Sequence, residues 1–225
     1  MKLVTTDSGR AALQFVFEEI RPLRGLALSI AVAALKDRYK FEGTPNFANR
    51  PWKDVENSPI EFNEGVFRHG DSIIPILRFT LYTDAIAVDC RTTDDAELVL
   101  NDIVQWARET LGFREFQKPP TRIFASAIVV EFGKPLEGLL SRWGEFQEIF
   151  WAPIRKLYEI DEPIGMFRLA VGCDPIRVSK ASIMSDVHIE RRTKEPFSSN
   201  RYFCTGPLRT REMIAALEAL EALIS

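Results

Sequence analysis

The stretch IIPILRFTLYTDAIAVDC (73–90) restricts the possible folds of this chain more than any other. Apolar and polar residues alternate on both sides of a short polar break near Thr83 and Asp84. This period of two is typical of a β-hairpin with one buried face. The next stretch, TTDDAELVLNDIVQWARETLG, changes to a helical period that ends at Gly112. The chain is therefore expected to combine a sheet with helices.

The same two periods assign most of the remaining chain. They predict helices at 23–41, 135–158 and 210–224, and strands at 122–132 and 164–173. Pro153 should kink or split the second of these helices, because proline has no backbone donor. Residues 10–20 fit a helix face and a strand face equally well, and both assignments stay open.

These elements predict one α+β domain over residues 1–225. Its largely antiparallel sheet would be built from hairpins, with three to four packed helices. No linker rich in proline, glycine and serine divides the chain. The hairpin–helix order of 73–111 recurs at 182–224, which suggests an internal repeat, although the two copies share no residue identity.

Composition indicates where such a chain resides. Its net charge of −3 provides no overall attraction to nucleic acid or to an anionic membrane. The longest apolar run, LALSIAVAAL, spans about 15 Å as a helix, half of a bilayer core. The cysteines Cys90, Cys173 and Cys204 lack CxxC spacing, as is usual for reduced, buried thiols. We expect a cytoplasmic protein with no membrane contact and no cofactor.

The stretch SDVHIERR contains one of only two histidines. On a strand, Asp186, His188 and Glu190 share one face, where they could transfer a proton or bind a metal. Metal sites need three or four converging ligands, and His69 lies in an unrelated segment, so no metal is expected. Cys204 is the nucleophile that a hairpin could bring to His188. We expect a solvated face with ion pairs, and retain His188, Glu190 and Cys204 as weak catalytic candidates.

Positive charge gathers between Arg177 and Arg211, where eight basic residues face three acidic ones. One interpretation is an anion or nucleic-acid site. Its candidates are Arg191, Arg192, Lys194, Arg201, Arg209 and Arg211. The other interpretation, which we favour, is an ordinary charged hairpin whose balancing acids come from elsewhere, such as the acidic helix at 94–109.

The predicted helix at 135–158 has more aromatic residues than one buried stripe needs. The candidates for a partner surface are Trp143, Phe146, Phe150 and Trp151. An exposed apolar face of this kind marks a protein interface. A central helix buried on all sides explains the same residues equally well, so both interpretations stay open.

Familiar catalytic motifs are missing from the sequence. It has no GxGxxG, P-loop, HExxH, CxxC or GxSxG pattern. We therefore predict a non-catalytic, intracellular interaction subunit that self-associates or joins a larger protein assembly. The alternatives are an anion- or nucleic-acid-binding protein that uses the basic segment 191–211, and an enzyme centred on His188 and Glu190.

Overall fold

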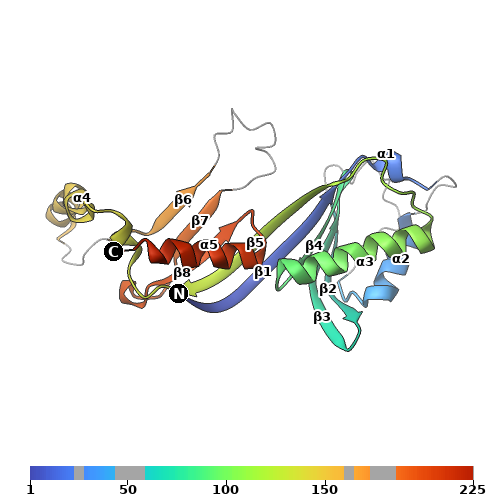
Figure 1. Ribbon diagram of the computed structural model, residues 1–225, viewed down its shortest axis with the longest axis horizontal. Helices are drawn as coiled ribbons and strands as arrows, with labels where there is room; N and C mark the ends of the chain where they lie inside the picture. Colours follow the sequence, from blue (N-terminus) through green and yellow to red (C-terminus); the bar gives the residue numbers. More distant parts are fainter. Residues whose placement is uncertain (23–27, 44–58, 160–164, 173–185, 225) are drawn as a thin grey trace. The chain divides into compact units, whose positions relative to one another are not determined.

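The computed structural model describes residues 1–22, 28–43, 59–159, 165–172 and 186–224 (Figure 1). The chain forms two compact units. The first unit comprises Met1–Thr6, Ala127–Pro207 and Arg211–Ser225, and the second comprises Asp7–Ser126 and Leu208–Thr210. The single domain expected from the sequence stays a prediction, because compactness alone does not show whether either unit folds independently.

The strands follow the hydrogen-bonded order β2-β3-β4-β1-β5-β8-β7-β6, and the assigned strand pairs are antiparallel. This confirms the α+β fold class. Two strands, β1 (Lys2–Gln14) and β5 (Thr121–Glu131), contribute residues to both units. The other described elements of the second unit are α1 (Phe17–Ile20), α2 (Leu28–Tyr39), β2 (Ile60–His69), β3 (Ser72–Leu81), β4 (Ala85–Cys90) and α3 (Thr93–Leu111).

In its described residues, the first unit contains two short 3₁₀ turns, two long helices and three strands besides β1 and β5. They are η2 (Leu136–Leu139), α4 (Trp143–Tyr158), β6 (Arg168–Val171), β7 (Val187–Arg191), η3 (Phe197–Ser199), β8 (Arg201–Gly206) and α5 (Thr210–Ala222). Helix α5 begins at Thr210, which belongs to the second unit. The strand–strand–helix order of β3, β4 and α3 recurs in β7, β8 and α5. The start of the second predicted copy, residues 182–185, lies outside the described residues, as does Cys173.

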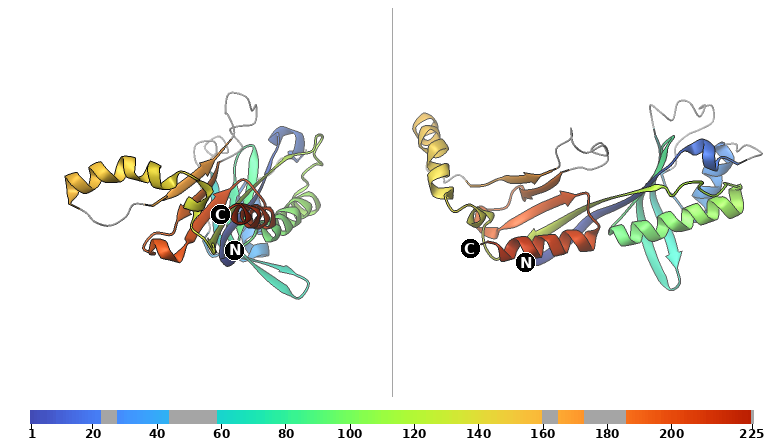
Figure 2. Two further views of the ribbon diagram at one scale, coloured as in Figure 1. Left: turned by 60° about the vertical axis from the view of Figure 1, so that its left-hand side comes forward. Right: turned by 45° about the horizontal axis from the view of Figure 1, so that its top comes forward.

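Helix α3 forms as its sequence predicts. The Thr92 hydroxyl accepts a hydrogen bond from the Asp95 backbone N–H at 3.1 Å, and Gly112 ends the helix with a φ of 71°. The helix covers one face of β3 and β4 (Figures 1 and 2). Beneath it lies an aromatic core in which the Phe62 ring centroid is 5.2 Å from that of Phe41 and 5.6 Å from that of Phe79.

The core of the first unit lies where α5 meets β8. Ile189 pairs with Cys204 and Arg191 pairs with Tyr202, and all four side chains are buried on one face. A Cβ at Gly206 would lie only 2.6 Å from Met213 Cε, so glycine lets α5 approach this face closely.

Three sequence-based assignments need correction or completion. Residues 10–20 combine both open alternatives, because β1 continues to Gln14 and α1 follows. The helix expected at 135–158 is interrupted: η2 comes first, and α4 starts only at Trp143. Pro153 does not split α4. Pro153 is exposed, so water can bond to the carbonyl left without its helical donor.

A buried carboxylate joins three strands of the second unit. Asp89 of β4 accepts hydrogen bonds from Arg10 of β1 at 2.7 and 2.9 Å and from Arg78 of β3 at 2.9 Å. Burial opposes ionisation of Asp89, but the hydrogen bonds and charges of both arginines outweigh it, and the net effect lowers its pKa. The folded state therefore favours the carboxylate.

We expect Asp89→Asn to lower the free energy of unfolding at neutral pH by about 1.5–3 kcal/mol, since hydrogen bonds to a charged acceptor are lost. Because the folded-state pKa is depressed, the contribution of Asp89 is complete above about pH 4 and is lost as pH falls through the folded pKa. Urea unfolding between pH 2 and 7 should show the two proteins converging in acid. Asp71→Asn, at an exposed turn, is the control, and a pH-independent gap would contradict the assignment.

Candidate functional site

The β7–β8 register separates the proposed catalytic residues. His188 pairs with Thr205, and Cys204 pairs with Ile189. Because paired residues share a face and neighbours along a strand alternate, His188 and Cys204 lie on opposite faces of the sheet. The approximate pairing of His188 with Cys204, on which the weak catalytic candidates depended, is off by one residue, and Cys204 is a buried thiol as favoured from the sequence.

Cys204 is fully buried, and burial raises the pKa of its thiol to about 12. A thiol with that pKa stays protonated at neutral pH and is a poor nucleophile. On the opposite face, Glu190 accepts a hydrogen bond from Arg168 at 2.8 Å. His188 Nε2 lies 4.0 Å from Asp186 Oδ2. The geometry is that of a partly solvated face with ion pairs.

Arg191 occupies a buried position in the first unit. Its guanidinium donates to both carboxylate oxygens of Glu137 at 2.8 and 3.0 Å, and to the carbonyls of Met166 and Phe197 at 2.9 Å each. It also lies 4.3 Å from the Phe197 ring centroid and 5.0 Å from that of Tyr202. These contacts join η2, η3 and β7. They use the donors that an anion would need, so Arg191 does not suit the predicted anion site.

Two further arginines of the basic segment are also paired. Arg201 donates to Glu131 at 2.9 Å and to Glu195 at 3.1 Å. Arg209, in the second unit, is paired with Glu97 of α3 and lies 4.1 Å from the Phe124 ring centroid. Hydrogen bonding to Arg209 is the main reason that the pKa of Glu97 is lowered.

These pairs show which acidic residues neutralise the arginines of the basic segment. Glu131, Glu137 and Glu97 all lie outside the basic segment, and Glu97 belongs to the acidic helix proposed at 94–109. The remaining candidates of the segment are exposed; they are Arg192, Lys194 and Arg211.

Helix α4 exposes an apolar surface. Phe146 and Phe150 are each 50% exposed, and their ring centroids are 5.2 Å apart. Trp143 is half-buried and packs on Phe146 at 5.5 Å, whereas Trp151 is only 6% exposed. Of the four predicted partner residues, Phe146 and Phe150 are therefore available to a partner and Trp143 is partly available. Trp151 belongs to the interior.

Sequence reasoning missed the most exposed members of this surface. Ile149 is 68% exposed and Leu157 is 72% exposed. We define the α4 stripe as Phe146, Ile149, Phe150, Pro153 and Leu157. At 100° per residue these five positions lie within about 100° of the helix circumference, and that spacing was readable from the sequence.

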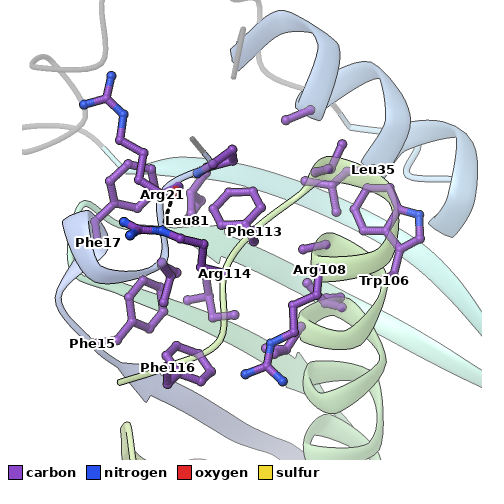
Figure 3. Close-up of a pocket in the computed structure, with 18 of the residues that line it drawn as sticks. Phe15, Phe17, Arg21, Leu35, Leu81, Trp106, Arg108, Phe113, Arg114 and Phe116 are labelled. Carbon is purple, nitrogen blue, oxygen red and sulfur yellow. Dashed lines mark hydrogen bonds between the residues drawn. The ribbon is translucent and has the colours of Figure 1, made fainter. Parts of the chain in front are cut away.

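The second unit contains a pocket of about 240 Å³ (Figure 3). It lies between α1, α2, α3, the adjoining sheet and the segment that follows α3. Its wall includes the ring pairs Phe15–Phe116 and Phe17–Phe113, with centroids 5.5 and 6.2 Å apart. Figure 3 shows three arginines around these rings, namely Arg21, Arg108 and Arg114. Sequence reasoning missed this pocket because 113–116 have no helical or strand period.

Within the described segments, no helix is long and apolar enough to cross a bilayer, and no cluster of three metal-ligating side chains forms. No family model and no curated protein matches the sequence. Among solved structures, Methanococcus jannaschii TBP is similar over 99% of this chain and 97% of that chain, with 14% identity and a TM-score of 0.39. A similarity this weak does not identify a function.

Proposed function

We propose that this chain is a protein-interaction subunit whose α4 stripe inserts into an apolar groove on a partner chain. The exposure of four large apolar side chains on one helix face carries the proposal: Phe146, Ile149, Phe150 and Leu157 are each at least 50% exposed. Contiguous apolar surface of this kind marks a binding face in a folded protein. Figures 1 and 2 show α4 extending away from the strands of its unit.

The spacing of the stripe fits helix-in-groove recognition. Its residues follow the i, i+3, i+4, i+7 pattern by which amphipathic helices anchor in hydrophobic grooves. The 16 residues of α4 extend about 24 Å, enough for three turns of anchors. Because the aromatic rings of Phe146 and Phe150 contact each other, the N-terminal part of the stripe is partly ordered before binding.

Charges beside the stripe are largely neutralised within the helix. Arg142 is paired with Glu145, and Arg155 lies 4.0 Å from Glu148. A partner therefore meets an apolar stripe bordered by balanced charge. We expect the interaction to depend weakly on salt, in contrast to nucleic-acid binding through the exposed Arg192, Lys194 and Arg211.

Ile149→Asp should weaken partner binding at least about thirtyfold, because it places a charge among the apolar anchors of the stripe. Light scattering over a range of concentrations measures self-association as a mass above 25.6 kDa. If the chain is monomeric, quantitative pull-downs with wild type and variant should reveal a partner lost only with the variant.

Leu98→Asp, which alters an exposed leucine of α3, is the matched control and should leave binding intact. Trp151→Asp is unsuitable, since a charge at that buried site would disturb folding. A monomer whose captured proteins do not differ between wild type and Ile149→Asp would disprove the proposal.

A further inference from the structure

We propose that the pocket of the second unit binds a small amphipathic carboxylate, with its apolar body among the phenylalanine rings and its anionic head at Arg108. The pocket belongs to the second unit and α4 to the first. This inference is therefore independent of the proposed partner surface.

The cavity suits an apolar body of limited size. Apart from its few charged residues, its wall is made of aromatic and aliphatic side chains such as Phe15, Leu81, Ile103 and Trp106. Its volume of about 240 Å³ holds about eight groups of the size of a water molecule or a methylene. That space matches a short alkyl chain or a single aromatic ring system, and it is below the range usual for larger ligands.

The charges around the cavity are unbalanced. Among the lining residues that the structure describes there are three arginines, and Glu18 is the one carboxylate. Glu18 lies 3.6 Å from Arg21, so that pair accounts for one positive charge. The other two cations, Arg108 and Arg114, have no carboxylate partner within the described parts of the chain.

Both of these cations are held in place by uncharged groups. The Arg108 guanidinium lies 5.1 Å from the Phe116 ring centroid. Arg114 Nε donates to the Arg21 carbonyl at 2.9 Å, and its Nη2 donates to the Glu18 carbonyl. Figure 3 shows both side chains beside the aromatic rings. Positioned cations next to an apolar cavity form a site for an anion with an apolar tail.

The experiment is a calorimetric titration of the full chain with octanoate. The comparison ligand is octanol, which has the same chain length and an uncharged head group. Burial of the seven-carbon tail alone predicts a Kd of about 0.1 mM, which we expect for octanol. Octanoate should bind about tenfold more tightly, because its carboxylate also accepts charge-assisted hydrogen bonds. Equal affinities would overturn the anionic part of the proposal.

Substitutions in the pocket test the contributions of the ligand's charged head and apolar tail separately. Arg108→Gln should weaken octanoate binding about tenfold and leave octanol binding unchanged. The control is Arg91→Gln, at an exposed arginine of the same unit that does not line the pocket, and it should alter the binding of neither ligand. Val104→Phe, which fills the cavity, should abolish both. Ala107→Leu is the smaller filling variant to use if the first does not fold.

Two results would overturn the site itself. One is the absence of heat from octanoate at millimolar concentration, and the other is unchanged octanoate binding in a folded, cavity-filled variant. Ile149→Asp should leave the titration as in the wild type, so failure of this proposal is distinguishable from failure of the α4 proposal.

Discussion

Arg191→Met is expected to lower the free energy of unfolding by about 3–5 kcal/mol. The Arg191 side chain is 5% exposed and Glu137 is 13% exposed, so the substitution leaves a carboxylate without its cation in a nearly dry environment. It also removes the donors to the carbonyls of Met166 and Phe197. Urea unfolding followed by circular dichroism measures the loss.

A double variant tests whether the unpaired charge is the cause. Combining Arg191→Met with Glu137→Met should cost less than Arg191→Met alone, because neither buried charge then remains. Arg192→Met, the neighbouring exposed arginine, should change stability by no more than about 0.5 kcal/mol. If Arg191→Met is as mild as Arg192→Met, the buried pair is not structural and Arg191 returns to the anion-site candidates.

Part of the role of Arg191 was visible in the sequence. Strand alternation places it with Val187 and Ile189, on the parity opposite to His188 and Glu190, and Ile189 and Arg191 are indeed buried. The density of positive charge around it nevertheless suggested a binding role. Its partner Glu137 is 54 residues away, and no local period reports a contact of that sequence separation.

The register of β7 and β8 was less predictable than the strands themselves. The connection between them includes η3 and Asn200, which has a φ of 48°. Such a long connection does not fix which residues pair, and a shift of one residue exchanges the faces. The alternative register would have placed Cys204 beside His188, whereas the observed register leaves it in the core, as expected for a buried thiol. The weak catalytic candidates therefore depended on the least predictable feature of the hairpin.

Strand β2 was missed for a different reason. Its buried positions are Ile60 and Phe62 before Glu64, and Gly65 and Phe67 after it. Glu64 has a φ of 54°, and the change of parity there interrupts the alternation by which a strand is found. The hairpin strands β3 and β4, helix α3 and strand β5 have clearer signals, namely alternation, helical spacing and a nearly continuous apolar run, and the sequence predicted each of them.

Phe62→Ala should destabilise the second unit by about 3–5 kcal/mol. Phe62 is fully buried, and its ring contacts those of Phe41 and Phe79, so truncation leaves a cavity among side chains that cannot all move inward. Ile73→Ala, at a position of β3 that is 59% exposed, removes apolar atoms without making a cavity and should cost far less. Urea unfolding of the three proteins measures the difference.

The same variant tests the prediction of a single domain. Val88 belongs to the core of the second unit, with Phe62, and Cys204 belongs to the core of the first unit. If the two units unfold together, Phe62→Ala should lower protection from hydrogen exchange equally at Val88 and at Cys204. If the first unit folds alone, its slowest amides should keep wild-type protection while those around Val88 exchange faster. Mass spectrometry of peptides from both units distinguishes these outcomes, and unchanged protection at Cys204 would show the single-domain prediction to be wrong.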